Sequence, residues 1–187
     1  MDIENKNEKS LNRLGPIFAV LIMRLWLGVR SLQSGIEKFS TQVPVSTWTK
    51  IDGHPNEHGV ETITYIKKYG FDHYSGMPAS TLQEFKEEPF FSESILTLYS
   101  ACIGPAFIIL GISLLLGVLS RVSLLGMGLI YTSLTFGLIL LNQSSGVAWL
   151  ASHILLVVLM LLYIEFNRLE ISRIIPGASR FAVLRNL

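Results

Sequence analysis

Charge is scarce in this sequence, and its scarcity excludes several classes of protein. Only 16% of the 187 residues are charged and 50% are hydrophobic, whereas soluble domains contain about 25% charged residues. The charged residues are missing from long apolar blocks, which indicates membrane spans and not a larger soluble core. The net charge is +1, so the chain lacks a strongly basic surface, and we expect no nucleic-acid partner.

Cysteine and histidine are also rare, which excludes most redox and metal centres. The single cysteine cannot form an intrachain disulfide, a CxxC pair or a cysteine-rich zinc or iron–sulfur site. A haem held by two histidines between spans is excluded, because His153 alone lies in an apolar segment. His54 and His58 have an i, i+4 spacing, but neighbouring glycines and a proline disfavour a helix, so they are weak metal candidates in a solvated loop. We expect no metal or cofactor to be bound by this chain alone, with a quinone as the open alternative.

Four apolar segments approach the length of about 20 residues that a helix needs to cross a bilayer. They are residues 14–37, 95–119, 122–141 and 147–166. Only "SR" separates the second from the third and "NQSSG" the third from the fourth, so these helices must run antiparallel. The sequence therefore predicts a single all-α membrane domain over residues 1–187, built as a four-helix antiparallel bundle.

The lysines and arginines outside these spans predict the orientation of the chain. They gather near the two termini, whereas acidic residues outnumber lysines in the loop 39–94. By the positive-inside rule, both termini are cytoplasmic and the loop is extracytoplasmic. The basic tail 168–187 has intermittent apolar residues and is expected to rest on the cytoplasmic surface.

The long loop is predicted to carry two short helices at the membrane interface. "GVETITYIKKYG" has apolar residues at helical intervals, at Val60, Ile63 and Ile66. "PASTLQEFKEEP" has the serine-to-glutamine spacing of a capping box. We expect both helices to lie over the outer end of the bundle.

The first span carries polar residues on two faces. One face combines small residues with two cations and would let another helix approach closely; it consists of Arg24, Gly28, Ser31, Gly35 and Lys38. The second is a polar stripe of Arg30, Gln33, Ser34 and Glu37. An arginine at the bilayer centre costs at least about 2.5–3.5 kcal/mol, so neither face should contact lipid.

The two arginines of this span lead to different expectations. Arg24 is predicted near mid-membrane, with a buried partner or a water-filled cavity. For Arg30 two interpretations stay open: it snorkels outward and pairs with Glu37, or it forms an outer cluster with Gln33, Glu37 and His153. Such a cluster would hold a quinone carbonyl or relay protons. Alternatively, its members only satisfy one another and fix the helix register.

"RLWLGVRSLQSGIEKF" resembles the opening helix of DoxX/DoxD-like membrane proteins, and residues 104–130 are similar to the passage from their second to their third helix. The positions that match are Arg24, Gly28, Gly35, Lys38, Gly111, Gly117 and Arg121. The family often has a glutamate in its second helix where this chain has Gly104 and Pro105. No role of that glutamate is therefore carried over.

The resemblance implies an integral subunit of a larger complex in a bacterial or archaeal cytoplasmic membrane. It suggests an association with quinone-linked electron transfer, without a redox centre in this chain. Two alternatives stay open: a purely structural accessory subunit whose small-residue stripes dock against neighbours, and a small carrier. Because the sequence shows no nucleophile–base pair, metal-ligand set or phosphate loop, we expect a non-catalytic subunit whose partners are the lipid bilayer and other membrane subunits.

Overall fold

The structure is a computed structural model that describes residues 2–48, 50–51, 54–55, 61–89 and 91–167. In chain order its elements are α1 (Asp2–Glu37), β1 (Ser40–Trp48), β2 (Lys50–Ile51), β3 (His54–Pro55), β4 (Glu61–Tyr69), the 3-10 helix η1 (Phe71–His73), α2 (Ala79–Glu87), α3 (Glu93–Leu116), α4 (Ser120–Leu140), α5 (Ser144–Leu162) and the 3-10 helix η2 (Ile164–Phe166). The predicted tail 168–187 lies outside the described residues.

Four of the helices are long and apolar enough to cross a membrane: α1 from Leu14 to Glu37, α3, α4 and α5. This confirms the four apolar helices that the sequence predicts, with ends that differ by a few residues. Large apolar side chains on their outer faces are exposed, including Ile22, Leu98, Leu129 and Leu155. A belt of exposed apolar side chains is what helices surrounded by lipid require.

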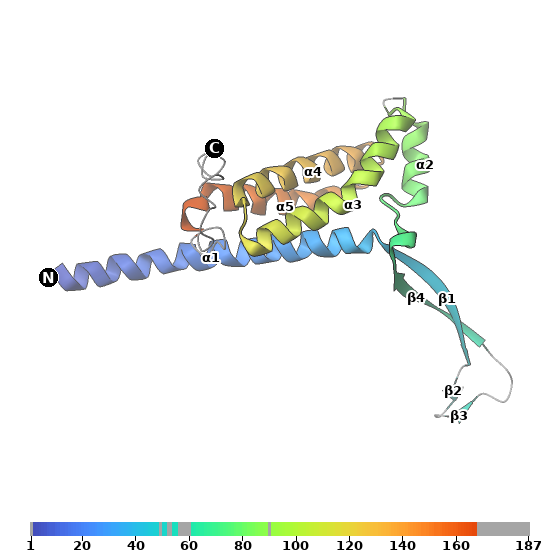
Figure 1. Ribbon diagram of the computed structural model, residues 1–187, viewed down its shortest axis with the longest axis horizontal. Helices are drawn as coiled ribbons and strands as arrows, with labels where there is room; N and C mark the ends of the chain where they lie inside the picture. Colours follow the sequence, from blue (N-terminus) through green and yellow to red (C-terminus); the bar gives the residue numbers. More distant parts are fainter. Residues whose placement is uncertain (1, 49, 52–53, 56–60, 90, 168–187) are drawn as a thin grey trace.

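The helices pack in a fixed pattern around a small apolar core. Helix α1 lies along α3 and also contacts α5, while α4 packs against both α3 and α5. Figure 1 shows the N-terminal part of α1 extending well past the ends of the other helices. The buried residues at the centre include Leu27, Phe107, Leu124, Met127 and Met160.

Helices α1 and α3 approach closely at glycine positions. A Cβ atom at Gly111 would lie 2.8 Å from the backbone nitrogen of Leu32 and 3.0 Å from the carbonyl oxygen of Gly28. The Ser31 hydroxyl, on the same face of α1, donates to the carbonyl oxygen of Phe107 at 2.8 Å. Small residues therefore bring the two backbones together, and a buried hydrogen bond joins them.

Tight turns reverse the chain between α3, α4 and α5. Gly117 has φ 68°, and the Val118 N–H donates to the carbonyl of Ser113 at 2.9 Å, a bond of the Schellman type. Asn142 has φ 55° after α4. Glycine and asparagine tolerate this left-handed conformation, which explains how such short linkers connect long helices.

The helix predicted over residues 59–70 was wrong, because residues 61–69 form a strand. Strand β4 pairs antiparallel with β1, from Ser40 opposite Tyr69 to Trp48 opposite Glu61. Residues 62–66 read "TITYI", an unbroken run of β-branched and aromatic residues, which favours a strand. The ribbon of β1 and β4 projects away from the helices (Figure 1), so this mostly helical chain also carries a β-ribbon that the sequence analysis did not predict.

The second predicted loop helix is present as α2, but its predicted cap is not. The N-cap residue is Pro78, without a side-chain cap, and Ser80 lies inside the helix. The buried Phe85 of α2 reaches α4, where its Cζ would be 2.9 Å from a Cβ at Gly137. The ring of Phe85 also makes an edge contact with the ring of Phe91, with 5.2 Å between the ring centroids. These aromatic contacts hold α2 over the end of α4.

The segment between η1 and α2 is anchored in α3 by Tyr74. Pro105 lies inside α3 and has no N–H to donate to Ala101 four residues earlier. The Tyr74 hydroxyl accepts a hydrogen bond from the Gly104 N–H at 3.3 Å. It donates to the carbonyl oxygens of Ser100, at 2.6 Å, and of Ala101, at 2.9 Å. Tyr74 therefore repairs the gap that Pro105 leaves in the helix.

Candidate ligand-binding site

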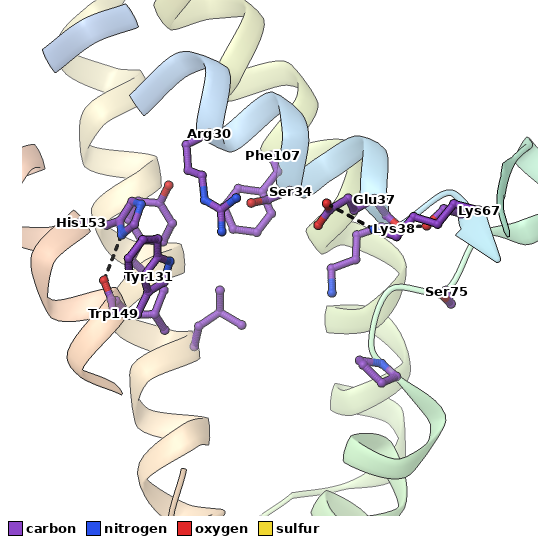
Figure 2. Close-up of a pocket in the computed structure, with 14 residues that line it drawn as sticks. Arg30, Ser34, Glu37, Lys38, Lys67, Ser75, Phe107, Tyr131, Trp149 and His153 are labelled. Carbon is purple, nitrogen blue, oxygen red and sulfur yellow. Dashed lines mark hydrogen bonds and ion pairs between the residues drawn. The ribbon is translucent and has the colours of Figure 1, made fainter. Parts of the chain in front are cut away.

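A cavity of about 380 Å³ lies where the C-terminal end of α1 meets α3, α4, α5 and the segment anchored by Tyr74. Sites for small molecules have volumes of about 300–1,000 Å³, so the cavity can hold one ring system. Its wall combines apolar, hydroxyl-bearing and charged side chains: Phe107, Leu134, Trp149, Leu150, Pro78, Tyr131, His153, Ser34, Ser40, Ser75, Arg30, Glu37, Lys38 and Lys67. Figure 2 shows these side chains around a central space.

The deep wall of the cavity carries two buried polar atoms that have no hydrogen-bond partner among the described residues. They are the Tyr131 hydroxyl and His153 Nε2, and both residues are only 3% exposed. A buried polar group without a partner costs about 1–3 kcal/mol. Such groups call for an explanation, and both belong to residues that line the same cavity.

The tautomer of His153 follows from its neighbour on α5. His153 Nδ1 lies 2.9 Å from the carbonyl oxygen of Trp149 (Figure 2). Because a carbonyl oxygen only accepts, Nδ1 carries the proton, and Nε2 of the neutral ring presents a lone pair. The ring is held between Tyr131, at 5.5 Å between centroids, and Trp149, at 5.3 Å. The deep wall therefore offers one acceptor, His153 Nε2, beside the Tyr131 hydroxyl.

Arg30 brings a positive charge from α1 to the same wall. Its Cζ lies 5.8 Å from the centroid of the Trp149 ring, a cation–π contact. Its Nη1 donates to Gln33 Oε1 at 3.0 Å, and Gln33 Nε2 donates to Glu37 Oε1 at 3.3 Å. Arg30 is therefore linked to Glu37 through Gln33, while its guanidinium lies over the Trp149 ring.

The opposite side of the cavity is also positively charged. Lys67 of β4 lies 3.6 Å from the Glu37 carboxylate. Burial lowers the pKa of Lys38, and the adjacent charge of Glu37 opposes this shift. Arg30, Lys38 and Lys67 therefore face one carboxylate in the cavity. This charge balance favours ligands that present oxygen acceptors.

Arg24 lies elsewhere, at the other end of the helices. It is buried, and its Nη1 donates to Asn167 Oδ1 at 2.8 Å. Asn167 Nδ2 in turn donates to the hydroxyl of Ser120, the first residue of α4. Arg24 thus has a buried partner, but it lies level with the start of α4 and not halfway along it. The depth of Arg24 in the membrane stays a prediction.

The remaining predicted site residues have different surroundings. Gln33 is exposed and does not line the cavity. Gly28, Gly35 and Gly111 lie in the contact between α1 and α3. His54 is exposed in β3, and His58 lies outside the described residues. Within the described part of the chain, no three histidine, cysteine or acidic side chains are grouped closely enough to bind a metal.

Several lining residues were missed by the sequence analysis. Trp149 is one of them; it lies four residues before the predicted His153 on α5, a spacing that places both on one face. That signal was available in the sequence, as was the hydroxyl of Tyr131 within an apolar helix. Nothing in the sequence indicated that Lys67 lines the cavity, because its position depends on the pairing of β4 with β1.

Comparison with family models, with curated proteins and with solved structures gives no match to this chain. The resemblance to DoxX/DoxD-like proteins therefore stays a prediction.

Proposed function

We propose that this chain is a multi-pass subunit of a membrane complex associated with quinone-linked electron transfer, and that its cavity binds the ring of a quinone. The observation that carries the proposal is the buried, unpartnered Tyr131 hydroxyl, a hydrogen-bond donor on an aromatic cavity wall that Arg30 and Lys38 also line. The chain itself supplies a binding site and no redox centre.

The chemistry of the cavity suits a flat ring with oxygens on its edge. Phe107, Tyr131 and Trp149 provide aromatic surface for stacking. The Tyr131 hydroxyl donates to one ring oxygen, and the positive charges of Arg30 and Lys38 attract the electron-rich oxygens. Ring burial and oxygen recognition are therefore combined in one space.

The proposed topology is a four-helix antiparallel bundle in the cytoplasmic membrane of a bacterium or archaeon. The four apolar helices support this arrangement, and the distribution of lysine and arginine favours cytoplasmic termini. In that orientation the loop 39–94 is extracytoplasmic. The cavity lies at the end of α1 that joins this loop, so it opens near the outer surface.

The proposal is tested by isolating the tagged protein from gently solubilised native membranes and identifying bound proteins and quinones by mass spectrometry. We expect haem, iron–sulfur or flavin subunits together with quinone. A Tyr131→Phe variant should retain about tenfold less quinone, because the deep hydrogen-bond donor to a ring oxygen is lost. A matched Tyr163→Phe variant, changed at an exposed position outside the cavity, should retain it. Isolation without quinone and without redox subunits would contradict the proposal.

An accessory role is the second candidate, and the ribbon favours it. Trp48, Ile63 and Tyr65 share one face of the β1–β4 pair by register and are 59%, 62% and 64% exposed. An isolated two-stranded hairpin is marginally stable in water, so this apolar face suits a partner protein. Replacing Trp48 and Tyr65 with serine should then release partner subunits while quinone remains bound; unchanged partner recovery would contradict this role.

A carrier role receives less support from the helices. Alternating-access carriers of the broken-helix type use interrupted spans at the membrane centre. Helix α3 continues through Gly104 and Pro105, and Tyr74 fills the hydrogen-bonding gap there. The one interruption that the sequence suggested is therefore part of a continuous helix.

A further inference from the structure

We propose that the cavity binds a phosphate group through the ammonium of Lys38. The position of this lysine in the chain favours the headgroup of an anionic membrane lipid over a soluble phosphate ester as the source of the phosphate. The inference concerns the side of the cavity that lies across from Tyr131 and Trp149 (Figure 2), and it does not require that a quinone binds.

The ammonium of Lys38 is held at the cavity by the surroundings of its backbone. Lys38 directly follows α1 and lines the cavity. Its carbonyl oxygen accepts a hydrogen bond from the Ser75 N–H at 2.7 Å, and a Cβ at Gly104 of α3 would lie 3.2 Å from its own Cβ. Figure 2 shows the half-buried side chain reaching into the central space. The neighbouring elements therefore fix where this positive charge lies.

The carboxylate nearest to Lys38 in sequence is engaged by other groups. Glu37 Oε1 accepts from Gln33 Nε2 at 3.3 Å and lies 3.6 Å from Lys67 Nζ. In the part of the chain that the structure describes, no hydrogen bond or ion pair joins the Lys38 ammonium to another side chain. The ammonium therefore has donors to offer to a ligand.

The charges of the cavity wall are unbalanced in favour of an anion. Three cationic side chains, those of Arg30, Lys38 and Lys67, line the cavity with the single carboxylate of Glu37. Burial lowers the pKa of Lys38, which shows that the loss of water around its charge is not fully compensated within the chain. A bound anion would supply this compensation.

The donors on this side suit an anion with several oxygen atoms. The Lys38 ammonium has three N–H groups, and the hydroxyls of Ser34 and Ser75 belong to residues that line the same cavity. Phosphate oxygens accept such hydrogen bonds, and bonds between ionised partners are about twice as strong as those between neutral ones. A phosphate therefore uses the charge of Lys38 more fully than a neutral ring oxygen would.

The location of Lys38 identifies a lipid headgroup as the favoured source. The apolar part of α1 ends at Glu37, so Lys38 lies at the level of the headgroup layer, just outside the hydrocarbon core. Basic pockets between transmembrane helices bind the headgroups of anionic lipids. The side chains of Lys67 and Glu37 are 50% and 42% exposed, so this side of the cavity is open and a headgroup can reach Lys38.

The proposal is tested by native mass spectrometry of the full-length protein in a neutral detergent. The probes are phosphatidylglycerol and phosphatidylcholine with the same acyl chains. Phosphatidylglycerol is anionic, whereas the choline group of phosphatidylcholine adds a positive charge that the cations of the wall repel. We expect phosphatidylglycerol to bind about tenfold more tightly, the ratio that corresponds to one hydrogen bond between charged groups.

Three variants assign this preference to the cavity. Lys38→Met should weaken phosphatidylglycerol binding about tenfold. Lys68→Met removes the same charge from an exposed position of β4 outside the cavity and should leave the affinity within about twofold. Glu37→Gln removes the carboxylate of the wall and should strengthen phosphatidylglycerol binding. A variant that had merely lost its structure would not bind more tightly.

Glycerol 3-phosphate, which has the phosphate ester without acyl chains, separates the two sources. If it does not displace phosphatidylglycerol and the binding depends on Lys38, the site is a lipid site. Displacement that is lost in Lys38→Met would support the phosphate site and assign it to a soluble ester. Equal affinities for the two lipids, or a Lys38→Met variant with wild-type affinity, would overturn the inference. None of these measurements includes a quinone, so they leave the proposed function to its own test.

Discussion

At the scale of single residues, Tyr74 joins a loop to the interior of a helix. Pro105 interrupts the hydrogen bonding of α3, and the Tyr74 hydroxyl occupies the gap through bonds to Gly104, Ser100 and Ala101. The ring of Tyr74 also packs against Phe39 at 4.7 Å. This one side chain therefore holds the segment that closes one side of the cavity.

Removal of the Tyr74 hydroxyl should destabilise this connection. In Tyr74→Phe the gap in α3 is left unfilled, at a cost of about 1–3 kcal/mol for unsatisfied backbone groups. The measurement is the midpoint of thermal unfolding of the purified protein, which should fall. Tyr69→Phe, at an exposed position of β4, is the control and should not change the midpoint. Equal midpoints for both variants would show that the hydroxyl contributes nothing.

A second prediction at this scale concerns Lys38. Burial lowers its folded-state pKa below the ordinary 10.5, so between these two values the unfolded chain binds more protons than the folded protein. The contribution of Lys38 to stability therefore rises with pH through this window. We expect Lys38→Met to raise the unfolding midpoint at neutral pH. The midpoint of this variant should rise less than that of the wild type as the solution becomes alkaline. A pH series of unfolding midpoints tests this; unchanged slopes would contradict it.

At the scale of elements, the contact between α1 and α3 depends on the absence of side chains. At Gly35 a Cβ would lie 2.6 Å from Ile108 Cγ1 and 2.9 Å from the Ile108 backbone nitrogen. At Gly111 the conflicting atoms belong to the backbone of α1, which cannot move as a side-chain tip can. The helix pair is therefore sensitive to any added methyl group at this contact.

Gly111→Ala should separate α1 from α3 and destabilise the protein by about 1–3 kcal/mol, the usual cost of overpacking. The measurement is the free energy of unfolding in a denaturing detergent titration. Gly128→Ala is the matched control, because a Cβ there would meet Val157 Cγ1 at an ordinary 3.5 Å. The control should be neutral or slightly stabilising, since alanine has a higher helix propensity than glycine. Equal effects of the two substitutions would argue against a close α1–α3 contact.

At the scale of the whole molecule, two separate polar groups mark the two ends of the packed helices. The cavity lies at the end of α1 near Lys38, and the bonds of Arg24 to Asn167 lie near the start of α4. In the proposed topology these ends face opposite sides of the membrane. The cavity then opens towards the extracytoplasmic side, beside the β1–β4 ribbon.

This topology predicts which positions a membrane-impermeant thiol reagent can reach in intact cells. In a Cys102→Ala background, a cysteine at Thr64 of β4 should be labelled from outside. A cysteine at Val118, between α3 and α4, should be labelled only after the membrane is permeabilised. If the cysteine at Val118 were labelled in intact cells and the cysteine at Thr64 were not, the orientation would be the opposite of the proposed one.

The apolar spans and the turns between them could be predicted from the sequence because their causes are local. The length of an apolar run selects a membrane-spanning helix, and the short linkers "SR" and "NQSSG" leave no room for anything except a reversal. The spacing of Arg30, Gln33 and Glu37 also follows from one helix, and the structure joins these three residues by hydrogen bonds. The relative positions of residues on a single helix can be predicted from the sequence because the helical period fixes them.

The tertiary structure alone decided which residues from different elements meet. The strand at 61–69 depends on a partner at 40–48, which the periodicity of either segment by itself does not reveal. Likewise Tyr131 of α4, His153 of α5 and Arg30 of α1 line one cavity, and Arg24 meets Asn167, only once the helices have packed. Local sequence sets the type of each helix, whereas the register between helices depends on packing over the whole chain.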